Sequence, residues 1–338
     1  MGTLVAVVIP FYQRTSGLLR QAVASALEQV LPDHHRLVVV VVDDASPVHA
    51  YDDLAELSAH PSVVILTKAN EGVAAARNSG LDYLRDLRPT YVSFLDSDDA
   101  WVQGHLLNAI RSLDHDADMY YGNHKYLGSE ISAFERSSTI KAWVAGVGGN
   151  PDAVRRTNDP DVYEFAGAFA ADQFALEYTA HTSTVVYRYE RLSDLRFNRD
   201  LRTAGEDSMF WIDVALHSRI VRFTTKVCTI CGYGESIFQS SLSWSHPLAH
   251  RRHAYSVLFN TIVLRKPLSQ DVKVRVRQKL RRSEAAFLYL LLRKMVKTGS
   301  FDRDIVGIVL RSQWSLAFRF PYRLLCAVGA RKNEQYWS

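Results

Sequence analysis

The chain has 338 residues, of which 47% are apolar, and a formal net charge of +4. This length allows one large domain or two smaller ones, and the apolar fraction is ordinary for a packed globular protein, which excludes a fibrous or disordered chain. No stretch reaches about 18 apolar residues, so we expect no transmembrane helix. The first residues lack a basic segment followed by a long apolar run, so we expect no signal peptide.

Three cysteines are too few for a disulfide framework, and a reducing cytoplasmic location is the expectation. Cys228 and Cys231 form a C-x-x-C pair. No second pair and no suitably spaced histidine pair follows them, so we interpret both as buried side chains and not as zinc ligands.

The first part of the chain alternates strand-like and helix-like segments. Expected strands are Leu4–Ile9, Leu37–Val42, Val63–Leu66, Tyr91–Leu95 and Met119–Tyr126. Amphipathic segments between them predict helices over Leu18–Val30, Tyr51–Ala59, Val73–Leu87 and His105–Leu113. Val38 to Val42 is a run of five valines, which is typical of a strand buried on both faces. The alternation predicts an α/β fold with a mostly parallel sheet flanked by helices.

The pattern changes after residue 128. From Ser129 to Asp172 it is irregular, and we expect a functional loop or insertion there. Thr182–Tyr187 and Ile220–Ile230 have strand character, and Gly205–Leu216 predicts a helix. From about Arg251 onward the chain reads as helical and basic: residues 265–332 hold seventeen Lys and Arg against four acids.

Three carboxylates crowd into Asp96-Ser97-Asp98-Asp99, directly after a predicted buried strand. Carboxylates in this place would lie at the ligand-binding edge of an α/β sheet. Unit charges about 4 Å apart repel by roughly 1–4 kcal/mol, and a divalent cation removes that cost. Taken alone, the cluster is equally consistent with a solvated turn that caps the helix beginning near Gly104.

Further motifs follow in a fixed order. Pro10, Phe11 and Tyr12 end the first strand, and Asp43 and Asp44 end the second. Carboxylates at such a strand end can accept hydrogen bonds from a nucleoside base or a ribose. Asn70 to Gly80 opens the third helix with Gly72, a small-residue face and Arg77, and Glu206 and Asp207 start a later helix.

Together with the D-x-D cluster, these motifs resemble glycosyltransferase family 2, the inverting nucleotide-diphospho-sugar transferases of GT-A fold. The resemblance covers roughly residues 4–245. It implies that Asp44 contacts the nucleoside, that Pro10, Phe11 and Tyr12 line the base, and that Asn70, Gly72 and Arg77 face the nucleotide. It implies an Mn²⁺ or Mg²⁺ ion on Asp96 and Asp98, with His246 as a further ligand. It also implies Asp207 as general base, with Glu206 second, and Asp99, Trp101 and Trp211 near the sugar or acceptor.

Each role has a structural alternative. Asp43 and Ser46 can cap a helix, and Asn70 and Gly72 can be ordinary turn residues. Arg77 can form a salt bridge to Asp43 or Asp96. Further alternatives are core packing for Trp101, helix N-terminal stabilisation for Glu206-Asp207, and a surface or packing position for His246.

The resulting prediction is a cytoplasmic, metal-dependent inverting glycosyltransferase that uses a nucleotide-diphosphate sugar, most simply a UDP-sugar, in the synthesis of a cell-envelope polysaccharide. Its acceptor would be a glycan or a lipid-linked glycan. Two rivals stay open: a sugar-phosphate nucleotidyltransferase, and a non-catalytic glycan-binding or scaffold protein of the same fold. The basic helices lack interleaved stacking aromatics, so we expect no nucleic-acid partner.

The predicted organisation is a GT-A catalytic domain over residues 1–245 and a basic, amphipathic helical region over residues 246–338. The catalytic domain would comprise a nucleotide-binding half (1–126) and an acceptor-binding half (127–245). In the C-terminal region, basic residues accompany an apolar stripe that includes Phe287, Leu288 and Leu291. The stripe indicates either peripheral contact with the cytoplasmic face of an anionic membrane, or packing on the catalytic domain or on a second subunit of a homo-oligomer.

Overall fold

The computed structural model describes residues 2–114, 116–146, 154–202, 204–233, 246–316, 318, 319 and 322. The chain divides into two compact units. The first comprises Met1–Arg199 and Phe210–Glu235, and the second comprises Asp200–Met209 and Ser236–Ser338.

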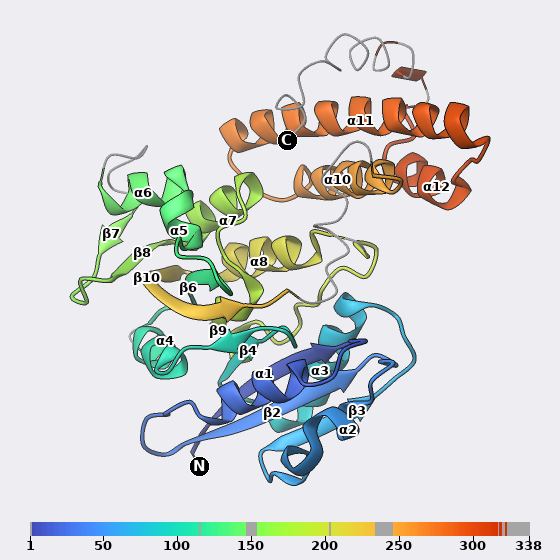
Figure 1. Cartoon of the computed structure of the whole chain (residues 1–338). Coiled ribbons are helices and arrows are strands. Elements are labelled where there is room, and N and C mark those ends of the chain that lie inside the picture. Colours follow the sequence, from blue (N-terminus) through green and yellow to red (C-terminus); the bar gives the residue numbers. More distant parts are fainter. Residues whose placement is uncertain are drawn as a thin grey trace. The chain divides into compact units, whose positions relative to one another are not determined.

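The first unit is built on one mixed sheet with the strand order β3-β2-β1-β4-β9-β6-β10-β8-β7, and β5 pairs with β10 beside this path (Figure 1). The first four of these strands are parallel, β6 and β10 are parallel to each other, and β9 joins the two groups by antiparallel pairing. The predicted α/β fold is confirmed. The strands are β1 (Thr3–Phe11), β2 (His35–Asp43), β3 (Val63–Thr67), β4 (Tyr91–Phe94), β5 (Ala100–Trp101), β6 (Met119–Tyr126), β7 (Arg155–Arg156), β8 (Val162–Ala166), β9 (Val186–Arg188) and β10 (Ile220–Cys231).

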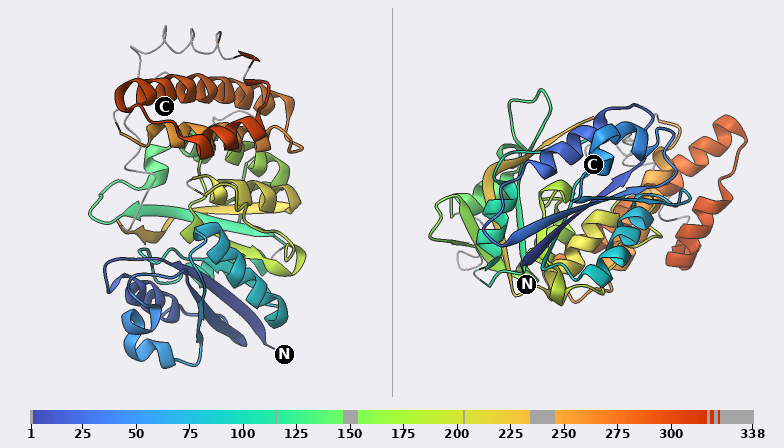
Figure 2. Two further views of the ribbon diagram at one scale, coloured as in Figure 1. Left: turned by 90° about the vertical axis from the view of Figure 1, so that its right-hand side faces the viewer. Right: turned by 90° about the horizontal axis from the view of Figure 1, so that it is seen from below.

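Helices cover both faces of the sheet, as Figure 2 shows for β1 and β2. Val5, Val7 and Ile9 of β1 belong to one core cluster with residues of two helices, α1 (Leu18–Leu27) and α4 (His105–Asp114). On the other face, Val8 meets α3 (Val73–Leu87), and Phe94 of β4 contacts the rings of Phe210 and Trp211 in α8 (Glu206–His217). This alternation is the period of two that a strand imposes. The expected helix over Tyr51–Ala59 is split into α2 (Ala50–Leu54) and the 3₁₀ turn η1 (Ala55–Ala59).

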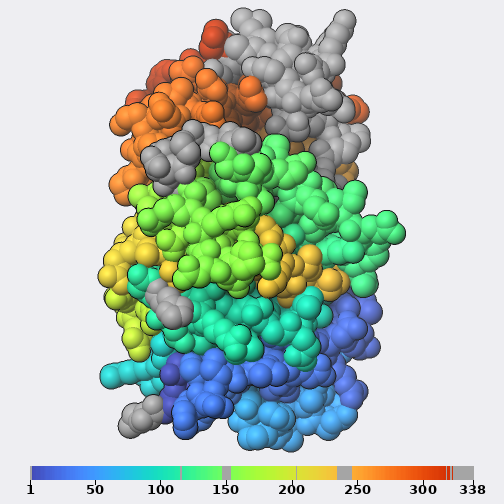
Figure 3. Space-filling model, turned by 90° about the vertical axis from the view of Figure 1, so that its left-hand side faces the viewer, coloured from blue at the N-terminus to red at the C-terminus, as the bar shows by residue number. Residues whose placement is uncertain are grey.

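The segment expected to be irregular contains regular structure. It holds α5 (Ala133–Arg136), α6 (Ser138–Val144), β7, β8 and α7 (Gly167–Leu176), which Figure 3 shows in green on one side of the unit. The two short helices depend on local caps: Ser132 and Glu135 form a capping box, and the Ser137 side chain accepts the N–H of Ile140. Elements of four to seven residues are too short to show a helical period in the sequence.

The second unit is mainly helical: α10 (Ala249–Val263), α11 (Gln270–Thr298) and α12 (Arg303–Ser312). α10 packs against both α11 and α12. The apolar stripe of α11 is buried, with Phe287 at 2% and Leu291 at 6% exposure, while Arg275, Arg277 and Arg281 are exposed. Packing therefore accounts for the stripe. Among the described residues, no helix is both long enough and apolar enough to span a bilayer.

The approach of α3 to β1 gives a test of the fold. A Cβ on Gly80, inside α3, would lie 2.4 Å from Cγ1 of Val8, whose side chain is fully buried. A Cβ on Gly307, inside α12, would meet only the flexible end of Arg311 at 3.3 Å. Gly→Ala in a helix interior gains up to about 1 kcal/mol, whereas overpacking costs about 1–3 kcal/mol. We expect Gly307→Ala to raise the free energy of unfolding and Gly80→Ala to lower it, by denaturant titration. Equal stabilisation by both would contradict the close packing of α3.

Candidate active site

Three parallel strands end at the same edge of the first unit's sheet. Phe11 of β1 pairs with Asp43 of β2, and the next N–H, that of Asp44, donates to the Phe11 carbonyl at 3.0 Å. Beyond β4, the Leu95 N–H donates to the Val8 carbonyl at 3.1 Å. The residues that follow each strand are thereby brought to one edge, the place where α/β sheets bind ligands.

Asp43 organises the loop after β2. Its Oδ1 accepts the N–H of Ser46 at 2.7 Å, and its Oδ2 accepts the N–H of Ala50 at 2.9 Å. The side chain is buried, and both oxygens serve the loop and the start of α2. These contacts match the capping alternative for Asp43.

Asp44 organises the turn before α3. Its Oδ1 accepts from Lys68 Nζ at 2.9 Å and from the Glu71 N–H at 3.0 Å, and its Oδ2 accepts the Gly72 N–H at 2.7 Å. Gly72 has φ +91°, a conformation that favours glycine. Asn70 is exposed in the same turn. Asp44 therefore fixes the backbone of the turn that the sequence predicts to face a nucleotide.

The end of β1 presents one exposed ring. Pro10 and Phe11 are buried, whereas Tyr12 is 37% exposed. Of the three residues predicted to line a base, Tyr12 is the one with an accessible side chain.

The D-x-D loop is held by ion pairing and hydrogen bonding. Arg77 Nη2 lies 2.8 Å from Asp96 Oδ1, and the Asp96 N–H donates to the Ser183 hydroxyl at 3.1 Å. The ion pair to Asp96 is one of the two predicted for Arg77. Burial by itself would raise the pKa of Asp96, but the charges of Arg77 and then His181 outweigh it and hold that pKa below its usual range. Asp98 is partly exposed.

Asp99 is the buried member of the loop. It accepts the Ser183 hydroxyl at 2.6 Å and the Gly232 N–H at 3.0 Å. Burial, together with the charges of Asp96 and Asp98, raises its pKa to about 6. Three neighbouring acids give the loop a high density of carboxylate oxygens. Carboxylate oxygens with excess negative charge are the donor set that Mg²⁺ and Mn²⁺ prefer, so Asp96 and Asp98 fit the expected cation.

Ser183 is a site residue that the sequence analysis missed. It is fully buried in the 3₁₀ turn η2 (Thr182–Thr184). Besides its contacts with Asp96 and Asp99, its carbonyl accepts from Trp101 Nε1 at 2.6 Å and from Thr229 Oγ1 at 2.9 Å. The sequence contains one signal for this turn: Thr182, Ser183 and Thr184 are three consecutive hydroxyl residues inside a strand-like run.

Gln13 is a second missed residue. It is 5% exposed, and its Nε2 donates to the hydroxyl of Ser97, the middle residue of the D-x-D motif, at 3.1 Å. Its backbone N–H donates to the Ser46 hydroxyl at 2.9 Å. Gln13 thus connects the loop after β2 to the loop after β4.

Two tryptophans predicted near the sugar are core residues. Trp101 is 6% exposed and its ring centroid lies 4.8 Å from that of His105. Trp211 is 1% exposed, and its Nε1 donates to the Thr182 hydroxyl at 3.3 Å. Their burial favours the packing alternative. Both indole N–H groups instead support the η2 turn that holds the D-x-D loop.

Glu206, Asp207 and His246 belong to the second unit. Glu206 and Asp207 form the first turn of α8, where acidic side chains favour a helix N-terminus. Asp207 is partly exposed, and its Oδ1 accepts the N–H of Ser208 at 2.7 Å. His246 precedes α10, and its Nδ1 accepts the N–H of Leu248 at 3.2 Å.

Comparison with known proteins gives a consistent result. Residues 6–178 match the model of glycosyl transferase family 2. The chain is 34% identical over 242 residues to the succinoglycan biosynthesis protein ExoW of Rhizobium meliloti (strain 1021), which covers 69% of this chain and 70% of that protein.

Among solved structures, S. aureus TarS 1-349 in complex with UDP-GlcNAc matches 100% of this chain and 89% of its own, with a TM-score of 0.58 and 16% identity. Mannosyltransferase PcManGT from Pyrobaculum calidifontis in complex with GDP-Man and Mn²⁺ matches 98% and 84%, with a TM-score of 0.52 and 18% identity. At such identities these likenesses concern the fold. By sequence and fold together, the chain belongs to glycosyl transferase family 2 and is a glycosyltransferase of GT-A fold.

Proposed function

We propose that this glycosyltransferase is metal-dependent and inverting, and that it moves a hexosyl or N-acetylhexosaminyl group from a UDP-sugar to a hydroxyl of a glycan or lipid-linked glycan. The observation that carries the proposal is the D-x-D loop, fixed by Arg77, Ser183 and Gln13 at the edge where β1, β2 and β4 end. The choice of UDP is supported by TarS, which is described with UDP-GlcNAc, and the glycan acceptor by ExoW, which is named for succinoglycan biosynthesis.

The nucleotide would lie along the strand ends. The exposed ring of Tyr12 can stack on a base, and the turn that Asp44 orders brings Asn70 and Gly72 to the same edge. Arg77 is buried and already committed to Asp96, so its guanidinium would position that carboxylate and contribute positive charge near a diphosphate. Asp99 is buried behind the loop and would support it, with any sugar contact coming second.

Asp96 and Asp98 would hold Mn²⁺ or Mg²⁺, which when bound offsets the negative charge of the departing nucleoside diphosphate. Asp207 would accept the proton of the acceptor hydroxyl as that oxygen attacks the anomeric carbon. Its carboxylate is partly exposed at the start of α8, and the Ser208 N–H holds one of its oxygens, which orients the side chain. Glu206 is buried in the same turn and is the second candidate.

Asp98→Asn tests the metal role. We expect the variant to keep its melting temperature without ligand, to lose activity by orders of magnitude, and to lose the extra stabilisation that UDP and Mn²⁺ give together, because a ligand stabilises a protein only as far as it binds the folded state. Asp86→Asn, at an exposed site on α3, is the matched control and should behave as wild type. Full wild-type activity after thorough EDTA treatment would contradict metal dependence.

Asp207→Asn tests the base. Asparagine keeps the Oδ1 acceptor for the Ser208 N–H but cannot take a proton. We expect kcat to fall by at least about 100-fold, with little change in the affinity for the donor, which is the pattern of an interaction made in the transition state. Asp213→Asn, later in the same helix, is the control. An equal loss of donor affinity would show that Asp207 binds the donor. Full activity would show that another residue is the base, and Glu206→Gln would be the next variant to test.

We also propose that the basic surface of α11 attracts the enzyme to an anionic membrane. The apolar stripe is buried, so the attraction would be electrostatic, at about 1 kcal/mol per basic residue near the lipid, and would weaken with salt. We expect the protein to sediment with phosphatidylglycerol vesicles at low salt. At about 0.5 M salt, screening shortens the distance over which charges attract, and we expect this binding to be lost. Changing Arg275, Arg277 and Arg281 together to Gln should abolish it, whereas changing the exposed Arg85, Arg88 and Arg111 of the first unit should not. Wild-type protein that ignores these vesicles at low salt would refute the proposal.

A further inference from the structure

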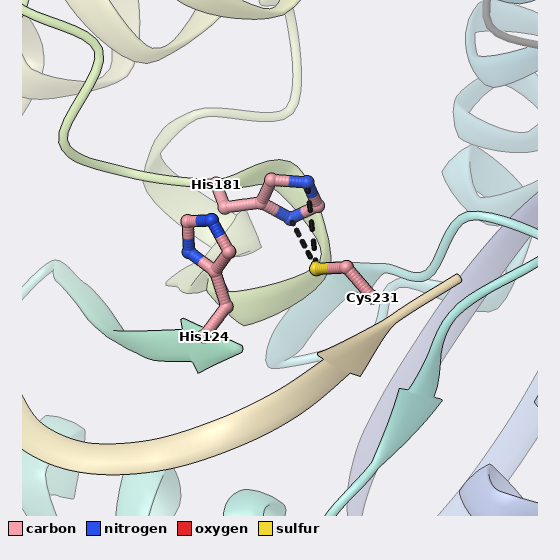
Figure 4. Close-up of side chains that lie close together, drawn as sticks. All are labelled: His124, His181 and Cys231. Atoms are coloured by element: carbon pink, nitrogen blue, oxygen red, sulfur yellow. Dashed lines mark hydrogen bonds between the residues drawn. The ribbon is translucent and has the colours of Figure 1, made fainter. Parts of the chain in front are cut away.

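Two histidines and a cysteine from three separate segments meet behind the D-x-D loop. They are His124 of β6, His181 at the start of η2, and Cys231 at the end of β10 (Figure 4). One ligand atom from each lies within 4.8 Å of the other two. The Cys231 Sγ is 3.8 Å from His181 Nε2 and 3.9 Å from His181 Nδ1.

Strand register brings the first and the last of these residues together. In the parallel pair of β6 and β10, His124 lies opposite Thr229, and Tyr126 lies opposite Cys231. Residues two apart on a strand share a face, so the His124 and Cys231 side chains project from the same face of the sheet. The Thr229 hydroxyl donates to the Ser183 carbonyl, which holds the η2 turn and its His181 over that face.

His124 is unsatisfied in its buried position. The residue is 7% exposed, and its Nδ1 has no hydrogen-bond partner. A buried polar atom without a hydrogen-bond partner destabilises the folded protein. Its ring lies 4.5 Å from that of His181, centroid to centroid, and Figure 4 shows the three side chains turned toward one another. An ion bound among them would be held by one nitrogen of each ring.

A carboxylate lies next to the cluster. Asp99 of the D-x-D loop accepts the N–H of Gly232, the residue after Cys231, at 3.0 Å. Asp99 Oδ2 also lies 3.9 Å from His181 Nδ1, which is beyond hydrogen-bond distance, and this nitrogen accepts the Ser183 N–H at 3.3 Å.

We propose that His124, His181 and Cys231 bind a Zn²⁺ ion that is separate from the divalent cation of the D-x-D motif. Two imidazole nitrogens and one thiolate are the ligands that zinc prefers, whereas Mg²⁺ and Mn²⁺ prefer the all-oxygen set of Asp96 and Asp98. Tetrahedral zinc with normal bond lengths places sulfur and nitrogen about 3.6 Å apart. The observed 3.8 Å between Cys231 Sγ and His181 Nε2 is close to this spacing, and the ligand atoms of all three residues lie within 4.8 Å of one another, so binding would draw the side chains together.

On binding, the thiol of Cys231 loses its proton to solvent as the zinc–sulfur bond forms, and a water or a further ligand takes the fourth position. The ion would join β6, β10 and η2 behind the D-x-D loop. The residue after Cys231 is Gly232, whose N–H donates to Asp99 Oδ1 at 3.0 Å. A Cβ at Gly232 would lie 2.0 Å from the Asp98 carbonyl oxygen, so this strand end packs directly against the loop. Bound zinc would therefore stabilise the position of the D-x-D loop.

Cobalt substitution in the whole 338-residue chain tests this proposal, because a cobalt–thiolate bond gives a charge-transfer band that the oxygen ligands of the D-x-D motif cannot produce. After chelator treatment, we expect Co²⁺ to give this band with one equivalent bound, and one equivalent of Zn²⁺ to remove it. Cys231→Ser should abolish the band, and His124→Gln should weaken Co²⁺ binding by at least about tenfold. Asp98→Asn should keep the band.

The other two cysteines supply the controls. Cys228 lies on the same strand, is 4% exposed, and bonds to the Lys226 carbonyl at 3.4 Å, away from the cluster. Cys326 lies outside the described residues. The double variant Cys228→Ser/Cys326→Ser leaves Cys231 as the sole thiol and should keep the full band. Absence of the band in wild-type protein, or its persistence in Cys231→Ser, would overturn the proposal. Because the wild-type and double-variant spectra decide the matter, a folding defect in Cys231→Ser would not prevent the test.

Discussion

The repulsion among the carboxylates of Asp96, Asp98 and Asp99 is the constraint around which the site is built. Two unit charges about 4 Å apart repel by about 1–4 kcal/mol, depending on screening. The protein compensates from two sides: Arg77 neutralises Asp96, and the Ser183 hydroxyl and the Gly232 N–H bind the buried Asp99. Burial, more than the neighbouring charges, keeps the pKa of Asp99 raised to about 6. A loop with residual negative charge and a partly exposed Asp98 is prepared for a cation.

This compensation depends on close packing elsewhere. Arg77 reaches Asp96 because the small residues of α3, ending in Gly80, let the helix approach β1 to within contact of Val8. Ser183 reaches the loop because Trp101, Trp211 and Thr229 fix the η2 turn through their polar groups. The aromatic core therefore contributes to the site through the backbone that it holds.

Much of the fold and the chemistry-bearing part of the site could be predicted from the sequence. The strands from β1 to β4 could be predicted because buried parallel strands are continuous apolar runs. The acids that follow them could be predicted as site residues because the ends of parallel strands share one edge of the sheet. The residues that hold the site in place could not be predicted from the sequence. Gln13 meets Ser97, and Ser183 meets Asp99, across 84 residues of chain in each case, and such pairs carry no local period or spacing. The short helices between residues 133 and 144 were hidden for a different reason, because capping decides them.

The C-x-x-C pair shows a limit of predicting metal ligands from their spacing along the chain. Such predictions assume that metal ligands lie near one another along the chain, as in small zinc modules. In a sheet, neighbours are instead set by register: His124 comes close to Cys231 because β6 and β10 are adjacent, while Cys228, three residues from Cys231, bonds to the Lys226 carbonyl. The sequence expectation treated both cysteines alike, yet the structure separates them. Cys228 is a buried core side chain. Cys231 faces one buried and one partly buried imidazole beside the acids of the D-x-D loop, so any chemistry of this cluster is tied to the position of that loop.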